Sequence, residues 1–176
     1  MMNQQSFLEA CKLVDVFSPN HIEFTALFRN TSTTSFDAND LESYSQILLD
    51  SSIGKSGDGI VVVRAAEHGA LSMSRTSRPT WLPSYYENNA PEVIDPTGAG
   101  NTFLGGFVSG WQKTGDVHES VCYGHVAASF ALEQIGLPKV EEEEGSIVCN
   151  DIVVKERLEE YKRRLSKASV KSEGVV

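Results

Sequence analysis

The pattern of apolar and polar residues predicts short strands that alternate with helices. Ile60–Val63 is a continuous β-branched run, typical of a buried strand in a parallel sheet, and Ala70–Ser74 forms a second strand after a tight turn. Shorter strands are predicted at Asp15–Phe17 and Glu92–Ile94. The aromatic, Pro-rich connection 75–90 is expected to contain one more strand.

Helices are predicted where apolar residues recur at spacings of three and four. The apolar stripes are Leu41, Tyr44, Ile47 and Leu48; Phe103, Phe107 and Trp111; Val117, Val121, Ala128, Leu132 and Ile135; and Val154, Leu158, Tyr161 and Leu165. Asn39, with Glu42 three positions later, is a predicted start for the first of these helices. Gly115 and Asp116 are expected to end the second helix and begin the third.

The carboxyl-terminal region is predicted to contain one more amphipathic helix, over residues 150–166. The acidic stretch Val140–Gly145 before it is expected to be a solvated loop. Residues 167–176 are expected to form a disordered tail.

The segment Ile94–Gly106, IDPTGAGNTFLGG, joins a predicted strand to a predicted helix through a glycine turn. Backbone N–H groups at the start of a helix lack partners, and with the helix dipole they form an anion site. An alternative is a plain left-handed turn, with Gly105 and Gly106 allowing close helix packing. A dinucleotide fingerprint is excluded because Phe103 occupies the third glycine position, and no Gly-Lys-Ser/Thr follows, as a Walker loop requires.

This glycine segment resembles the signature D-x-T-G-A-G-D of PfkB/ribokinase-family carbohydrate kinases. The matching residues are Asp95, Thr97, Gly98, Ala99 and Gly100. Two positions differ, because Pro96 replaces a usually polar residue and Asn101 replaces the final aspartate. The resemblance implies an α/β, ribokinase-like fold of three layers, Rossmann-type, of which the chain forms only the carboxyl-terminal half.

The same resemblance implies roles for the residues of the turn. The N–H groups of Gly98, Ala99 and Gly100 would form the anion hole for the transferring phosphoryl group of ATP. Asn101 stands at the position of the catalytic base, where the family has an aspartate. Asp95 and Thr97 match positions near the family's monovalent-cation site, for which K⁺ is the candidate ion.

Asn20 and Glu23 have two interpretations. Their spacing fits a capping box at a helix start. The family carries N-x-x-E at this place, and its glutamate helps to hold Mg²⁺ largely through water, which suits an oxygen ligand and an ion that keeps several waters. The resemblance therefore assigns both residues to the nucleotide site, with Glu23 as the metal-binding residue.

The hairpin after Ile60–Val63 resembles the family's V-T-x-G-x-x-G, which lies beside the ATP phosphates and ribose. Val63 and Gly69 agree with it, whereas Arg64 replaces the threonine and Ala66 the first glycine. Arg64 can pair with a phosphate, can fill space that a nucleotide needs, or can be a surface residue. Ala66 adds a methyl group at a position where backbone approaches a ligand.

Two features of the following helix belong to the same comparison. His125 lies on the apolar stripe, where a core histidine and a residue of the adenine pocket are the alternatives. The fungal branch of the family that includes a protein tied to maintenance of the killer virus looks similar around G-A-G-N and around S-F-A-x-E-Q, which is Ser129–Gln134 here.

Composition restricts the partners. The net charge of −9 argues against a protein that binds nucleic acid or a membrane surface. The last 22 residues carry seven Lys/Arg and four Asp/Glu, so the preceding residues carry eight against twenty, a balance of −12. Three widely spaced cysteines without a CxxC motif, and no apparent signal peptide or membrane span, indicate a reducing, cytoplasmic location.

The resemblance covers about residues 7–136, and residues 1–149 are expected to form the carboxyl-terminal part of the ribokinase-like domain. The family's amino-terminal half, which brings most sugar contacts, is not present. A half-domain exposes sheet edge, so a homodimer or that missing half is an expected partner. Three interpretations remain: an impaired kinase for a sugar or nucleoside, a non-catalytic relative that binds nucleotide or a protein, and an inactive fragment.

Overall fold

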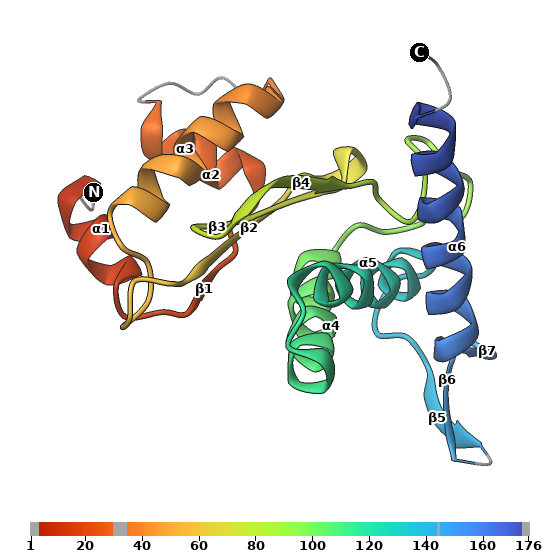
Figure 1. Cartoon of the computed structure of the whole chain (residues 1–176). Helices are drawn as coiled ribbons and strands as arrows, with labels where there is room; N and C mark the ends of the chain where they lie inside the picture. Colours follow the sequence, from red (N-terminus) through yellow and green to blue (C-terminus); the bar gives the residue numbers. More distant parts are fainter. Residues whose placement is uncertain (1–3, 30–34, 144, 174–176) are drawn as a thin grey trace. The chain divides into compact units, whose positions relative to one another are not determined.

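The chain folds as two compact units, Met1–Pro83 and Ser84–Val176. The division at residue 149 into a ribokinase-like part and a terminal helix stays a prediction. The computed structural model describes residues 4–29, 35–143 and 145–173 (Figure 1). Among these residues no helix is both long enough and apolar enough to cross a membrane.

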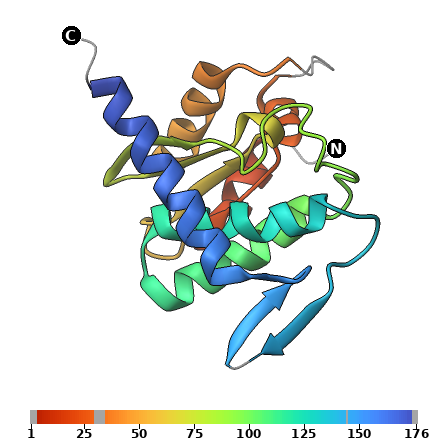
Figure 2. The ribbon, with the colours of Figure 1, turned by 90° about the vertical axis from the view of Figure 1, so that its right-hand side faces the viewer.

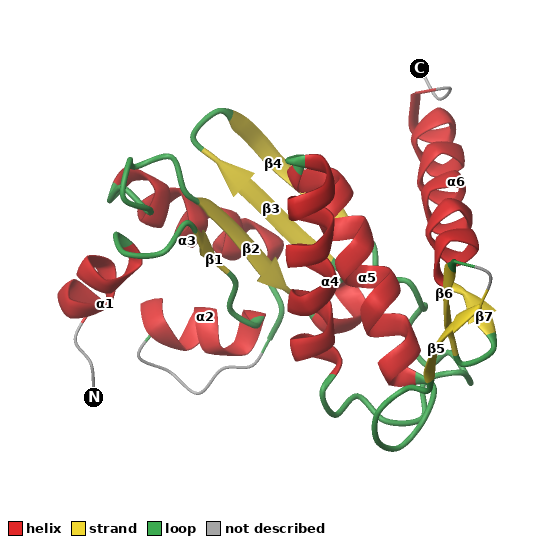
Figure 3. Ribbon diagram, turned by 90° about the horizontal axis from the view of Figure 1, so that it is seen from below, coloured by secondary structure: helices red, strands yellow, loops and turns green. Residues whose placement is uncertain are grey.

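The first unit is built around a four-stranded sheet in the order β1-β2-β3-β4. Its strands are β1 Val16–Phe17, β2 Ile60–Arg64, β3 Ala70–Ser74 and β4 Ser77–Leu82 (Figure 3). β1 runs parallel to β2, and the two following pairs are antiparallel. The predicted strands in this unit are thus confirmed, including the one in the Pro-rich connection. The continuous apolar run of β2 reflects its central place, because four of its five side chains are buried.

Three helices complete the first unit: α1 Gln4–Cys11, α2 His21–Phe28 and α3 Ala38–Asp50. Their apolar residues pack against β2 and β3 in one core, formed by Phe7, Cys11, Phe24, Leu41, Leu48, Leu49, Ile53, Val61, Val63, Leu71 and Met73. The predicted cap of α3 was wrong. Asp37 is the cap, because its Oδ1 accepts the N–H groups of Asn39 and Asp40 at 3.0 and 3.3 Å.

The second unit begins with the predicted helix pair, α4 Ala99–Thr114 and α5 Val117–Leu132. Gly115 ends α4 in the left-handed conformation, and the Asp116 side chain caps α5, as predicted. Close packing of the pair depends on Gly106, where an added Cβ would lie 2.5 Å from the Tyr123 carbonyl oxygen. A Cβ at Gly105 would meet nothing, so only one of the two predicted packing glycines has that role. Ile47, Trp111 and Ile135, which were assigned to apolar stripes, are exposed.

A small sheet follows α5, with strands β5 Val140–Glu143, β6 Ser146–Cys149 and β7 Ile152–Val153 (Figure 2). The predicted loop at 140–145 was therefore wrong for residues 140–143, which form a strand, although their side chains are solvated as expected. β5 pairs with β6 in an antiparallel hairpin, in which Val148 and Cys149 are buried. The side chains of β5 are all exposed, so its sequence lacks the apolar alternation of a half-buried strand.

Helix α6 spans Val154–Glu173, so it begins four residues after the predicted start at 150 and extends past the predicted end at 166 into the predicted tail. Lys155 pairs with Glu159 at 3.9 Å and Glu160 with Arg164 at 3.5 Å, both at the i,i+4 spacing that supports a solvated helix. Residues 174–176 lie outside the described residues.

The predicted strand at Glu92–Ile94 does not form. Instead, the N–H groups of Ile94 and Asp95 both donate to the Leu132 carbonyl oxygen, at 2.7 and 3.2 Å. Leu132 is the last residue of α5, so the segment satisfies the end of a helix rather than a strand neighbour.

Candidate active site

The glycine turn that precedes α4 is exposed and built by local hydrogen bonds. Asp95 Oδ1 accepts the Thr97 N–H at 2.9 Å. Hydrogen bonds from Thr97 lower the pKa of Asp95, so this carboxylate is ionised at neutral pH. Gly98 follows with φ 83° and ψ −13°, a left-handed conformation that favours glycine. The chain therefore enters α4 through a turn in which residue 98 takes the left-handed conformation.

The turn leaves backbone donors available at the start of a 16-residue helix. Ala99 N–H donates to the Pro96 carbonyl oxygen at 3.2 Å, so this predicted donor is used inside the turn. Among the described residues, the N–H groups of Gly98, Gly100 and Asn101 have no protein acceptor. Three of the four first donors thus remain for an anion, and the helix dipole favours negative charge there.

Asn101 is the third residue of α4, and its side chain is exposed. A carboxamide donates and accepts hydrogen bonds, but it does not take up a proton at neutral pH. The residue that aligns with the base position of the family signature can therefore hydrogen-bond a hydroxyl but cannot deprotonate it.

Asn20 and Glu23 form the predicted capping box at the start of α2. Asn20 Oδ1 accepts the Glu23 N–H at 2.7 Å, and Glu23 Oε2 accepts the Asn20 N–H at 3.2 Å. The second carboxylate oxygen of Glu23 makes no hydrogen bond to a described residue, and the side chain is exposed. One free carboxylate oxygen fits a metal held through water. In the described part of the chain, no three His, Cys, Asp or Glu side chains are grouped so that they could hold a metal ion.

Arg64 forms hydrogen bonds to residues 18 and 19, which lead to this cap. Its guanidinium Nη2 donates to the Ser18 carbonyl oxygen at 3.0 Å, and its backbone N–H donates to the Pro19 carbonyl oxygen at 3.0 Å. Burial lowers the pKa of Arg64, and the negative charge of Glu23 opposes that shift. The structure therefore brings together Asn20, Glu23 and Arg64, and phosphate binding by Arg64 stays a prediction.

Ala66 and Gly69 lie in a tight turn between β2 and β3. Ala66 has φ 50°, a left-handed conformation, which explains why a glycine suits this position in the family pattern. Gly69 has φ 91° and ψ −140°, and an added Cβ would lie 2.0 Å from the Leu82 carbonyl oxygen. Backbone geometry therefore accounts for the small residues at both positions, without a nucleotide contact at either.

His125 is buried, with 6% of its surface exposed. Its ring packs edge-on against Phe103 of α4, with ring centroids 5.2 Å apart, and lies 5.7 Å from the ring of Tyr161 of α6. This placement agrees with the interpretation of His125 as a core residue. A contact with adenine would need a more exposed ring than the structure shows.

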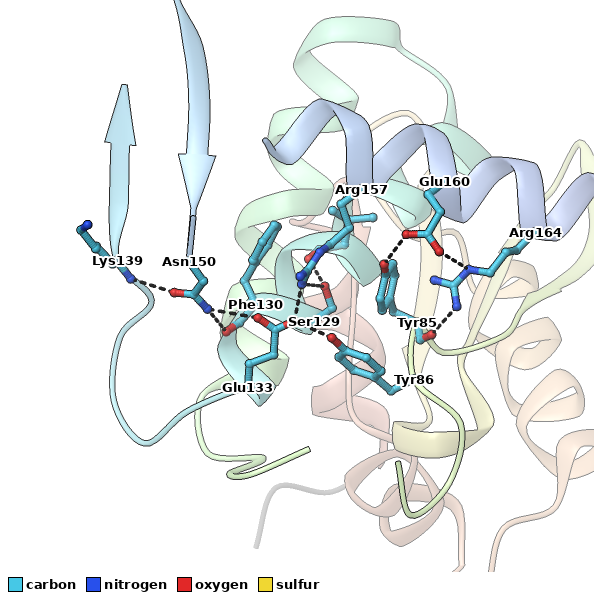
Figure 4. Close-up of polar contacts among 11 residues, drawn as sticks. Tyr85, Tyr86, Ser129, Phe130, Glu133, Lys139, Asn150, Arg157, Glu160 and Arg164 are labelled. Atoms are coloured by element: carbon cyan, nitrogen blue, oxygen red, sulfur yellow. Dashed lines mark hydrogen bonds and ion pairs between the residues drawn. The ribbon is translucent and has the colours of Figure 1, made fainter. Parts of the chain in front are cut away.

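Sequence reasoning missed a polar network around Glu133, the residue after α5 (Figure 4). Glu133 accepts hydrogen bonds from Tyr86 Oη, from Arg157 Nη1 and, at 3.2 Å, from Asn150 Nδ2. Arg157 also donates to Ser129 Oγ at 3.1 Å and stacks over the Phe130 ring at 3.8 Å. The S-F-A-x-E-Q string was the available signal, because three of its residues hold one buried arginine.

The mixed α/β fold and its glycine turn before α4 define a ribokinase-like protein. Residues 2–143 match the pfkB family of carbohydrate kinases, and the chain belongs to this family.

Two fungal proteins are among its relatives. An uncharacterized protein of Schizosaccharomyces pombe is 33% identical over 168 residues, covering 87% of this chain and 45% of that protein. Protein MAK32 of Saccharomyces cerevisiae is 30% identical over 88 residues, covering 48% of this chain and 24% of that protein. The similarity to a fungal branch is thus confirmed, and the chain spans less than half the length of these relatives.

Solved structures confirm the fold. The nucleoside kinase of Methanocaldococcus jannaschii has a TM-score of 0.59 at 22% identity and covers 90% of this chain and 44% of its own. The ribokinase of Arabidopsis thaliana, complexed with ribose and ATP, has a TM-score of 0.59 at 22% identity and covers 73% of this chain and 38% of its own.

Proposed function

We propose that the chain forms the nucleotide-binding part of a PfkB-type kinase, which transfers a phosphoryl group from ATP to a hydroxyl of a sugar or nucleoside. The observation that carries this proposal is the exposed glycine turn, with three backbone N–H groups free at the start of α4. Family membership supports it, as does the ATP and ribose bound by the Arabidopsis ribokinase.

Each element of the site has a role in this reaction. Phosphoryl transfer depends mainly on positioning and on stabilisation of negative charge. The N–H groups of Gly98, Gly100 and Asn101 would hold the transferring phosphoryl group, with the dipole of α4 behind them. Mg²⁺ neutralises phosphate charge when bound, and Glu23 would hold it through water with its free oxygen. Asp95 and Thr97 would lie beside a monovalent cation such as K⁺.

Asn101 sets the expected rate. Loss of a general base lowers a rate by about 10²–10⁴, which corresponds to about 3–5.5 kcal/mol in the barrier. A loose transition state needs little deprotonation of the acceptor, so slow turnover remains. The carboxamide at position 101 also favours a second function, in which the protein binds nucleotide without turnover. Saturable ATP binding with no phosphorylated product from ribose, fructose or adenosine would identify that function.

Replacing Gly98 with alanine is expected to weaken MgATP binding, because the left-handed turn that aims the free N–H groups becomes strained. An alanine in this conformation costs about 1–2 kcal/mol. Gly115→Ala is a matched control, since Gly115 ends the same helix at φ 64° and also faces open space. Both variants should lose similar stability on thermal unfolding, whereas calorimetric titration with MgATP should show weaker binding only for Gly98→Ala.

The proposal fails if the protein shows no MgATP binding under conditions where it is folded. It also fails if both variants bind MgATP as tightly as the wild type, because the turn would then have no part in the site.

A further inference from the structure

We propose that Glu133 and Tyr86 are positioning residues for the glycine turn, acting by closing the loop that leads into it. The inference rests on the proposed function of the turn. The loop is the segment 86–95. Its first residue is bonded to Glu133, the residue after α5, and its last two residues are bonded to Leu132, the last residue of α5.

The first end is held by a side chain and the second by the backbone. Tyr86 Oη donates to Glu133 Oε1. Ile94 and Asp95 donate their N–H groups to the Leu132 carbonyl oxygen, at 2.7 and 3.2 Å. Leu132 and Glu133 are consecutive, so these contacts close the loop at its base. Inside it, further bonds of 3.2 Å from Ala90 N–H to the Glu87 carbonyl oxygen and 3.1 Å from Val93 N–H to the Ala90 carbonyl oxygen limit its conformations.

Besides Tyr86, two residues hold the Glu133 carboxylate, as the dashed lines of Figure 4 show. Arg157 comes from α6 and is only 6% exposed, with its guanidinium pinned between Ser129 Oγ and the Phe130 ring. Asn150 comes from the end of the β5–β6 hairpin, and its amide also donates to the Phe130 carbonyl oxygen at 3.2 Å. A carboxylate held this way has one orientation, which makes it a firm anchor for Tyr86.

The charge state of the anchor suits this role. Burial alone would raise the pKa of Glu133, but hydrogen bonds from Tyr86, Arg157 and Asn150 outweigh burial and lower the pKa below its ordinary value. Glu133 is therefore ionised at neutral pH. Hydrogen bonds to an ionised acceptor are about twice as strong as neutral ones.

The link from the loop to the site is short. Asp95 ends the loop and also shapes the glycine turn, because its Oδ1 accepts the Thr97 N–H just before Gly98. Releasing Tyr86 lets the loop sample more conformations, and phosphate binding would then have to order Asp95 and the turn again.

The test compares Tyr86→Phe with a matched control, Tyr85→Phe. Each substitution removes one phenol hydroxyl that donates to a carboxylate, but Tyr85 Oη donates to Glu160 of α6, at 2.9 Å, and not to the end of α5. Hydrogen exchange at the Ile94 and Asp95 amides and calorimetric titration with MgATP are measured for both variants. We expect faster exchange at these two amides and roughly three- to tenfold weaker MgATP binding for Tyr86→Phe only, whereas both variants lose thermal stability.

The outcomes separate this inference from the proposed function. If the wild type does not bind MgATP, the proposed function fails, and the exchange data alone decide whether Tyr86 closes the loop. If the wild type binds MgATP but the two variants match each other in exchange and affinity, Tyr86 and Glu133 only stabilise the fold, and the inference is overturned.

Discussion

Asn101→Asp is expected to raise the rate of phosphoryl transfer by about 10²–10⁴. The substitution replaces a carboxamide by a carboxylate that can accept the hydroxyl proton of the acceptor. Residue 101 lies in the first turn of α4, where the helix dipole favours a negative charge. The new carboxylate should therefore be ionised and well placed as a base.

The measurement is the initial rate of ADP formation from MgATP with ribose, fructose or adenosine, using the protein expressed from its full coding sequence. Asn39→Asp is the control, because Asn39 is an exposed residue in the first turn of another helix, α3. It adds the same charge to the first turn of a helix outside the proposed site and should leave the rate unchanged. A rate that Asn101→Asp does not alter, with MgATP still bound, would show that residue 101 is not the base position.

Gly69→Ala is expected to have the largest effect on stability, a loss of about 3 kcal/mol or more in the free energy of unfolding. Gly69 combines φ 91° with ψ −140°, a region that residues with a side chain avoid. The added Cβ would also meet the Leu82 carbonyl oxygen at 2.0 Å, and this backbone atom belongs to β4, which is paired with β3. Urea unfolding of the variant and the wild type gives the difference.

Ala66→Gly, in the same turn, is the opposite test. Ala66 has φ 50°, and a glycine removes that strain while losing some backbone entropy on folding. A gain of about 0.5 kcal/mol is expected. Equal and small changes in the free energy of unfolding at both positions would contradict the backbone explanation. Gly69 would then be better explained by contact with a ligand.

Features that depend on neighbouring residues were predictable from the sequence. The capping box of Asn20 and Glu23, the left-handed end of α4 at Gly115 and the cap at Asp116 need only a few consecutive residues to form. The glycine turn belongs to the same group, because its conformation at Gly98 and the free donors after it follow from local backbone geometry.

Features that depend on distant partners were missed. The acidic stretch 140–143 forms a strand because β6 satisfies its backbone, and composition alone does not show this pairing. Glu92–Ile94 does not form a strand because its partner is the end of α5, about 40 residues later in the chain. The pairing of Glu133 with Arg157 joins residues that lie 24 positions apart in the chain, and the S-F-A-x-E-Q string does not show which residue pairs with its glutamate.

The site was predictable in part for the same reason. The sequence identified the turn, but it assigned all of its first amides to the anion hole, whereas Ala99 N–H is used by Pro96. It also left open three roles for Arg64, and only the fold shows that its guanidinium holds the Ser18 carbonyl oxygen next to the cap of α2. Hydrogen bonds of this kind depend on tertiary structure, so the sequence alone does not predict them.

Amide chemical shifts during a titration with MgATP show directly whether the glycine turn before α4 binds phosphate. The largest saturable shifts are expected at the backbone amides of Gly98, Gly100 and Asn101, with a smaller change at Ala99, whose N–H already has an acceptor. Saturable shifts elsewhere in the chain, with these three amides unmoved, would contradict phosphate binding at this turn.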